Sequence, residues 1–302
     1  FENKGKEEDV FYAYGISADL ISDVSSAGLI RVPSLKRVEE VADLSLDEKA
    51  IKLDVRYTAE GTLWKMDNMF QLSIELYDTK DKKVVWSDRW QEKWDNLTTI
   101  KGSLSDGILK ALDTTFNVER KVETTNTEAY EFYLKAEHKY DKRENTDDTE
   151  IARGLLKKAI ELDDNLIKAK ILLGTTYREM GDYDKAMDIF TSSLKQADEL
   201  SDKHGMGDSF NSIGAIYFHK GNFDKALECS NKSIAIADAL NDKYRKAISL
   251  NNNGVVSQNK GNYEEGLDYY QRSLAIQEEI GDQYGLAISL CNIGNIYNLK
   301  GD

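Results

Sequence analysis

Four glycines separated by a constant step of 40 residues limit most strongly how this chain can fold. They are Gly174, Gly214, Gly254 and Gly294. A second glycine follows each of them after seven residues, at positions 181, 221, 261 and 301. A constant step of this length is typical of chains built from repeated units that stack on one another. The C-terminal part of the chain is therefore predicted to be a repeat array.

Each unit of the array is predicted to contain two helices. The first ends at a glycine such as Gly181, which suits a left-handed C-terminal cap. In the second, small and apolar residues recur at every fourth position and form one stripe along the helix. The stripe consists of Ala186, Phe190 and Leu194 in one unit, of Ala226, Ser230 and Ile234 in the next, and of Gly266, Tyr270 and Leu274 in the third.

The glycines at the 40-residue step lie inside the predicted first helices. Glycine in a helix interior costs about 1 kcal/mol relative to alanine. We expect the close approach of a neighbouring helix, which only a missing side chain allows, to offset this cost at Gly174 and its equivalents.

The segment Leu173-Gly174-Thr175-Thr176-Tyr177 recurs as Ile213-Gly214-Ala215-Ile216-Tyr217 and as Ile293-Gly294-Asn295-Ile296-Tyr297. Together with the glycine and the alanine that follow, this pattern resembles the tetratricopeptide repeat family. A looser unit comes earlier, because Ala152 precedes Ala186 by 34 residues, the ordinary period of that family. The expected units are about residues 127–164, 165–204, 205–244 and 245–284, followed by a truncated unit at 285–302.

The resemblance implies an all-α right-handed superhelix of helical hairpins whose concave surface binds a protein or peptide. The first-helix positions expected to face inward are rich in asparagine, whose amide can pair with the main chain of a bound segment. The candidate binding residues are Arg178, Asn211, Phe218, Asn251, Asn252, Gln258, Asn292, Asn295 and Asn298. An exposed polar helix face that needs no partner accounts equally well for these residues, so both interpretations stay open.

Residues 1–117 are predicted to form a separate α+β domain. Helices are expected over Gly15–Ser26, after a capping box at Ser45 and Glu48, and over Leu97–Leu112. A short strand is expected at Leu29–Val32, ended by Pro33. Three further strands are predicted, and the middle one alternates apolar and polar residues as a half-buried strand should. They are Tyr57–Lys65, Met69–Tyr77 and Val84–Gln91.

This N-terminal segment resembles the TolB-like or FlgO-like domain of bacterial proteins. The residues that carry the resemblance are Tyr14-Gly15-Ile16-Ser17-Ala18-Asp19-Leu20-Ile21, Leu29-Ile30-Arg31-Val32-Pro33-Ser34, Tyr57-Thr58-Ala59-Glu60-Gly61-Thr62, Leu76-Tyr77-Asp78 and Val85-Trp86-Ser87-Asp88-Arg89. It implies that Phe1-Glu2-Asn3 is the tail of an edge strand whose start is missing. It also implies a bacterial signalling protein as parent, with an upstream class III adenylate or guanylate cyclase or a winged-helix domain.

Charge and hydropathy narrow the range of partners. The chain has 40 lysines and arginines against 54 aspartates and glutamates, a formal net charge of −14. A field of this sign repels phosphate backbones, so no nucleic acid is expected as a partner. No apolar stretch approaches the ~20 residues needed to cross a bilayer, and direct membrane insertion is not expected. A cytoplasmic location is predicted, with the periplasmic side of a membrane-anchored parent as the alternative.

No catalytic, cofactor or metal motif is recognisable, and the segment is predicted not to be an enzyme. Phosphate-binding glycine loops, nucleophile elbows and paired-cysteine motifs are absent from the sequence. The predicted function is a non-catalytic regulatory and scaffold segment. The alternative is a small-molecule sensor that uses a cleft near Trp64, Trp86, Trp90 and Trp94. Packing of these tryptophans in the core or against the last helix is favoured over a ligand platform.

Overall fold

The computed structural model describes residues 1–26, 32–112 and 124–300. The chain divides into two compact units, one made of residues 1–24 and 33–166 and the other of residues 25–32 and 167–302. The strand predicted at Leu29–Val32 and the domain boundary predicted at residue 117 fall largely or wholly outside the described residues. No helix among those described is both long and apolar enough to span a bilayer.

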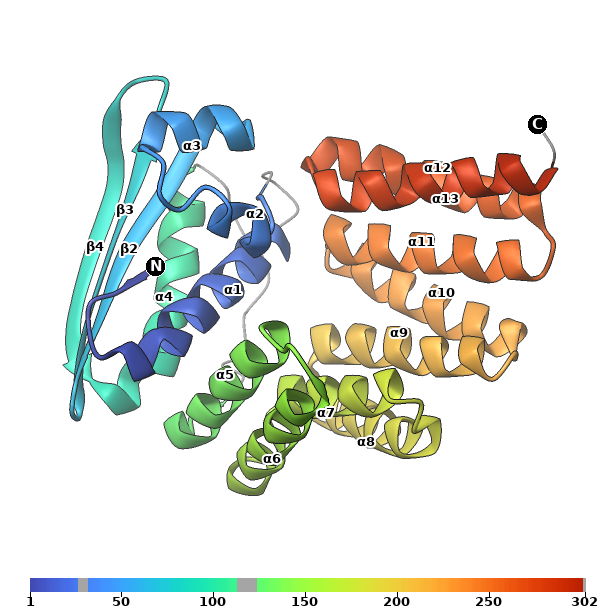
Figure 1. Ribbon diagram of the computed structural model, residues 1–302, viewed down its shortest axis with the longest axis horizontal. Helices are drawn as coiled ribbons and strands as arrows, with labels where there is room; N and C mark the ends of the chain where they lie inside the picture. The colour runs from blue at the N-terminus through green and yellow to red at the C-terminus, as the bar shows by residue number, and fades with distance from the viewer. Residues whose placement is uncertain (27–31, 113–123, 301–302) are drawn as a thin grey trace. The chain divides into compact units, whose positions relative to one another are not determined.

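The first unit is built on a four-stranded sheet with the order β1-β2-β3-β4 (Figure 1). Its strands are β1 Glu2–Asn3, β2 Tyr57–Met66, β3 Met69–Asp78 and β4 Lys83–Lys93. β1 runs parallel to β2, and the remaining pairs are antiparallel. In β3 the apolar residues Phe70, Leu72, Ile74 and Leu76 are all buried, as the alternating pattern predicts. The three predicted strands are therefore confirmed within one or two residues.

Helices lie between β1 and β2 and after β4 along the chain. They are η1 Glu7–Asp9, α1 Val10–Ser26, α2 Leu35–Glu39, α3 Leu46–Leu53, η2 Trp94–Asn96 and α4 Leu97–Ala111. α1 begins five residues earlier than predicted, and the short α2 was not anticipated. The capping box at Ser45 and Glu48 is present, with the Ser45 backbone N–H donating to Glu48 Oε2 at 3.0 Å.

A helical hairpin, α5 Thr127–Asp141 and α6 Thr146–Leu162, completes the first unit. Its helix α5 packs directly on α1, because a Cβ atom placed on Gly15 would lie 2.4 Å from Leu134. The Tyr130 hydroxyl hydrogen-bonds the buried carboxylate of Asp19 in α1, and the Trp94 ring nitrogen donates to Glu131 in α5. The first predicted repeat pair is therefore part of the compact unit that contains the sheet.

In its described residues, the second unit contains seven helices, which form three stacked antiparallel hairpins followed by one further helix (Figure 1). They are α7 Ile167–Glu179, α8 Tyr183–Glu199, α9 Lys203–His219, α10 Phe223–Ala239, α11 Lys243–Asn259, α12 Tyr263–Ile280 and α13 Gln283–Lys300. The predicted fold class, an α+β segment followed by a helical-hairpin solenoid, is confirmed. The change to a 40-residue step is accompanied by longer first helices, because α7 has 13 residues whereas α9 and α11 have 17 each.

The turns of the array explain why the repeat begins and ends helices at regular positions. Within hairpins, Gly181, Gly221 and Gly261 have φ values of 81°, 73° and 83°, a left-handed conformation that favours glycine. Between hairpins the left-handed residues are Ser201, Asn241 and Gly281. An aspartate follows each of these and caps the next helix, as when the Arg245 backbone N–H donates to Asp242 Oδ1 at 2.9 Å.

Three of the four glycines inside the first helices lie where the second helix approaches closely, as expected. A Cβ atom on Gly174 would lie 2.4 Å from the ring of Phe190, and one on Gly254 would lie 2.5 Å from the ring of Tyr270. On Gly214 it would lie 3.3 Å from the backbone of Ala226. Gly294 differs, because nothing among the described residues lies within 4 Å of such an atom.

Serine pairs that the sequence analysis did not single out join successive hairpins. They are Ser193 with Ser209 at 3.1 Å, Ser233 with Ser249 at 3.2 Å, and Ser273 with Ser289 at 3.5 Å between Oγ atoms. All six serines are buried. Each pair links a second helix to the first helix of the next hairpin at the same point of the 40-residue repeat. Because their hydroxyl groups pair with one another, these small residues allow close helix packing without leaving a buried polar atom unpaired.

Candidate peptide-binding site

The predicted binding residues all lie on the first helices of the hairpins. These helices contact one another, α7 against α9 and α11 against α13, and so form one layer of the array. Asn295 and Asn298 are exposed on α13. The other seven candidates are half-buried: Arg178, Asn211, Phe218, Asn251, Asn252, Gln258 and Asn292.

Four of the predicted amides form hydrogen bonds inside the array. Asn292 Nδ2 donates to Asn251 Oδ1 at 3.1 Å and thereby joins α13 to α11. Ser249 Oγ donates to Asn211 Oδ1 at 3.0 Å, joining α11 to α9, and the Tyr270 hydroxyl donates to Gln258 Oε1 at 2.9 Å. These residues therefore have a structural role that the sequence analysis did not foresee.

Asn252, Asn295 and Asn298 differ from those four residues. Across the described part of the chain, no hydrogen bond to another residue involves their side-chain amides. Each amide offers two donor hydrogens and one acceptor oxygen. Of the asparagines predicted to bind a peptide, these three are the ones whose whole amide group remains available.

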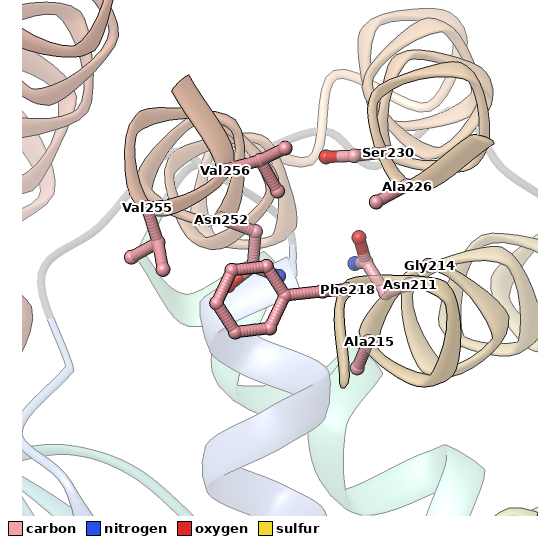
Figure 2. Close-up of a pocket in the computed structure, with 9 residues that line it drawn as sticks. All are labelled: Asn211, Gly214, Ala215, Phe218, Ala226, Ser230, Asn252, Val255 and Val256. Atoms are coloured by element: carbon pink, nitrogen blue, oxygen red, sulfur yellow. The ribbon is translucent and has the colours of Figure 1, made fainter. Parts of the chain in front are cut away.

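A pocket of about 80 Å³ lies between α9, α10 and α11 (Figure 2). Its lining residues are Asn211, Gly214, Ala215 and Phe218 from α9, Ala226 and Ser230 from α10, and Asn252, Val255 and Val256 from α11. Figure 2 shows the Phe218 ring extending from α9 toward Asn252 and Val255. The pocket thus brings together three of the predicted residues, Asn211, Phe218 and Asn252.

The pocket exists because one residue of the repeat is small. Position 230 is serine, whereas the residues 40 positions before and after it are Phe190 and Tyr270. Both of those rings are fully buried and lie against the glycine of their own hairpin. Gly214 has no such ring beside it, and the unfilled space forms the pocket.

A buried ionic cluster joins the N-terminal ends of α9 and α11, the two first helices that contribute to the pocket. Arg245 Nε donates to Asp208 Oδ1 at 2.8 Å, and Arg245 Nη1 donates to Asp242 Oδ2 at 2.7 Å. The Asp242 side chain is completely buried, and the Arg245 side chain is 17% exposed. Nearby, burial lowers the pKa of His204 below its usual value, and Arg245 adds to this effect. Since Arg245 lies on α11 and Asp208 on α9, the cluster fixes their separation.

The tryptophans have mainly structural contacts. A Cβ atom on Gly107 of α4 would lie 2.3 Å from the Trp86 ring, so Trp86 packs under the last helix of its sheet. Trp94 is buried, and its ring lies 4.6 Å from that of Tyr12 and 5.6 Å from that of Phe70. Trp64 is 47% exposed. The favoured interpretation of these residues as core packing agrees with the contacts of Trp86 and Trp94.

The described residues give little support for a metal site or for a reactive cysteine. Within them, no group of three or more histidine, cysteine, aspartate or glutamate side chains is arranged to hold a metal ion. Cys229 is buried, and burial raises the pKa of its thiol, so it behaves as a small apolar residue. Cys291 is exposed on α13.

Comparison with known proteins identifies the repeat. Residues 165–239 and 245–302 match the tetratricopeptide repeat family. The predicted repeat is therefore confirmed for these two stretches, which together contain α7 to α13 except for the first two residues of α11. None of the curated proteins compared with the chain matches it.

Two solved structures have a similar fold. BtubC (BKLC) from P. vanneervenii is 20% identical, with a TM-score of 0.50 over 57% of this chain and 73% of that one. The Rap protein complexed with Competence and Sporulation Factor is 16% identical, with a TM-score of 0.51 over 68% of this chain. The match spans only 55% of the Rap chain. Identities this low establish the fold alone.

Proposed function

We propose that this chain is a non-catalytic regulatory and scaffold segment that binds an extended protein or peptide on the first-helix layer of its repeat array. The observation that carries the proposal is the pocket between α9, α10 and α11, bordered by the unpaired amide of Asn252. A groove that holds peptides needs side-chain pockets for specificity and amide groups for the peptide main chain. This region offers both.

The family match and the Rap neighbour support this function. Stacked helical hairpins of the tetratricopeptide type present extended surfaces suited to polypeptide ligands. The Rap structure was determined as a complex with Competence and Sporulation Factor, which gives an example of partner binding by a protein of similar fold. The net charge of −14 favours partners that are uncharged or basic over acidic ones.

The nature of the whole protein is a wider proposal that rests on the N-terminal resemblance alone. In it, residues 1–117 form a TolB-like or FlgO-like domain and residues 118–302 form the repeat array of a bacterial signalling protein. An upstream adenylate or guanylate cyclase and a cytoplasmic location belong to the same proposal. Determining the sequence that precedes Phe1 in the intact gene tests it directly.

Selection from a library of random linear peptides displayed on phage, with the full chain as bait, tests peptide binding. Selected peptides are then titrated against variants of the chain. We expect Asn252→Ala and Asn295→Ala each to weaken binding about 5- to 10-fold, since a net hydrogen bond contributes about 1 kcal/mol.

Gln271→Ala is the matched control for this experiment. Gln271 is an exposed amide on α12, a second helix, and should leave the affinity unchanged. Failure to enrich any peptide would exclude the proposed function. Equal losses for Gln271→Ala and the two asparagine variants would place the binding surface elsewhere.

A further inference from the structure

We propose that the pocket between α9, α10 and α11 is an anchor subsite for one aliphatic side chain of a bound peptide. This inference rests on the proposed function and makes it specific. The peptide residue that enters the pocket is expected to be valine, isoleucine or leucine, and not a charged residue. Size, charge and the repeat itself each support this choice.

The volume of the pocket selects the size of the side chain. At about 80 Å³ the pocket is roughly half the ~150 Å³ of a cavity that binds benzene. It is also too large to be filled by one water, whose share of liquid volume is about 30 Å³. A branched aliphatic side chain fits within these limits.

The lining excludes charged residues and accepts a peptide backbone. None of the nine lining residues is charged, so an ionised side chain entering the pocket would lose its hydration without gaining a partner. Ala226, Val255 and Val256 provide apolar surface. At the border, the amide of Asn252 and the Nδ2 group of Asn211 have no hydrogen-bond partner within the described chain, and they can pair with main-chain groups on either side of the anchor.

The repeat shows that the vacancy is local to this hairpin. The neighbouring hairpins fill the equivalent volume from within, with the rings of Phe190 and Tyr270. The serine at position 230 leaves it open, and Ser230 Oγ is itself satisfied by donating to the Ser249 carbonyl oxygen at 2.9 Å. The vacancy therefore needs an apolar group from outside and not a second hydrogen-bonding partner.

The test compares peptides selected by the wild-type chain with those selected by two variants that fill the pocket. Ser230→Phe restores the ring found in the hairpin before it. Ala215→Leu fills the pocket from its half-exposed rim and serves if Ser230→Phe disturbs folding. Ala235→Leu makes the same chemical change on α10, away from the residues that line the pocket, and is the control. Circular dichroism verifies that each variant is folded.

We expect peptides selected by the wild-type chain and by Ala235→Leu to share valine, isoleucine or leucine at one aligned position. Replacing that residue by alanine should weaken binding about 10-fold for both proteins, and replacement by aspartate should weaken it further. For Ser230→Phe and Ala215→Leu, the same alanine replacement should change the affinity less than about 2-fold, because the filled pocket no longer receives the side chain.

The outcomes separate this inference from the proposed function. If peptides are enriched without an aliphatic preference, or if the preference survives both filling variants, the anchor subsite is wrong and peptide binding stands. If the preferred residue is aromatic or charged, the assigned side-chain class is wrong. If no peptide is enriched at all, both proposals fail together.

Discussion

Gly254 in α11 lies against the ring of Tyr270 in α12, so close that a Cβ atom at Gly254 would come within 2.5 Å of two ring carbons. The ring is fully buried, and its hydroxyl donates to Gln258 Oε1. Burial of the ring raises the pKa of Tyr270 to about 12. The contact therefore ties the two helices of the hairpin together at a point where only glycine fits.

Gly254→Ala should destabilise the second unit by about 1–3 kcal/mol, since the added methyl group must displace the buried ring. Gly294→Ala is the control, because Gly294 occupies the equivalent position on α13 with open space beside it. There, alanine should raise stability by up to about 1 kcal/mol through its helix propensity. Chemical unfolding followed by far-UV circular dichroism measures both, and equal effects would contradict the proposed role of close approach.

Asn253→Ile should stabilise the array by about 1 kcal/mol. Asn253 is completely buried, and its Oδ1 atom has no hydrogen-bond partner. The equivalent residues one step of 40 away are Ile213 and Ile293. Its Nδ2 group donates to Asn231 Oδ1 at 2.8 Å, and the exposed Asn231 can pair with water instead. Removing the buried unpaired oxygen recovers the free energy lost on its desolvation, of order 1–3 kcal/mol. The loss of the hydrogen bond to Asn231 offsets part of this gain.

The reverse exchange, Ile213→Asn, should destabilise the array by about 2–3 kcal/mol because it places an amide in an apolar cluster. Unfolding midpoints in denaturant measure both variants. A loss of stability in Asn253→Ile would show that the asparagine has a partner essential to the packing of α11.

Arg245→Met should destabilise the array by about 2–3 kcal/mol, because Asp242 would be left buried without its partner. Arg245→Lys should recover only part of this loss, since one ammonium group cannot bind Asp208 and Asp242 at once. Lys232→Met removes an exposed ion pair with Glu228 on α10 and should have no measurable effect. Thermal unfolding measures the stability of the three variants. Equal losses for Arg245→Met and Lys232→Met would show that the buried ionic cluster does not stabilise the array.

Asp78→Asn should make the stability of the first unit less dependent on acid pH. The hydrogen bonds from Arg56 lower the pKa of Asp78 to about 2, and those from the Asp81 and Lys80 backbone N–H groups contribute. In the unfolded chain the pKa of an aspartate is about 3.9. The folded state therefore gains stability from this carboxylate above about pH 4, and loses it as the pH falls towards 2.

The difference in unfolding free energy between the wild-type chain and Asp78→Asn should accordingly be largest above about pH 5 and should vanish near pH 2. Tryptophan fluorescence follows this unit selectively, because Trp64, Trp86, Trp90 and Trp94 all lie within it. A difference that stays constant down to pH 2 would mean that the ion pair does not set the pKa of Asp78.

Features that depend on neighbours in sequence were predicted well. The capping box at Ser45 and Glu48, the left-handed glycines such as Gly181 and the alternation in β3 follow from local backbone geometry and from helical or strand periodicity. The close packing at Gly174 and Gly254 was also predicted, because a glycine inside a helix weakens that helix unless a neighbour needs the space of the missing side chain.

Properties that depend on contacts between helices far apart in the sequence were predicted poorly. The sequence contains Ser230 in place of an aromatic residue, yet only the surrounding α9 and α11 determine that the vacancy remains open. The sequence pattern predicts Asn251 and Asn292 as groups that bind a ligand, but the stacking of α13 on α11 pairs their side chains with each other. The assignment of α5 and α6 to the same compact unit as the sheet likewise depends on the contact of Leu134 with Gly15.

The sequence by itself determined the repeat, the ends of its helices and the glycine positions, because each of these is set within a few residues by backbone conformation and by periodicity. The tertiary structure alone decided which amides are already paired and where a pocket is left. Those properties arise between side chains that lie far apart along the chain, and their distances depend on how every intervening helix packs.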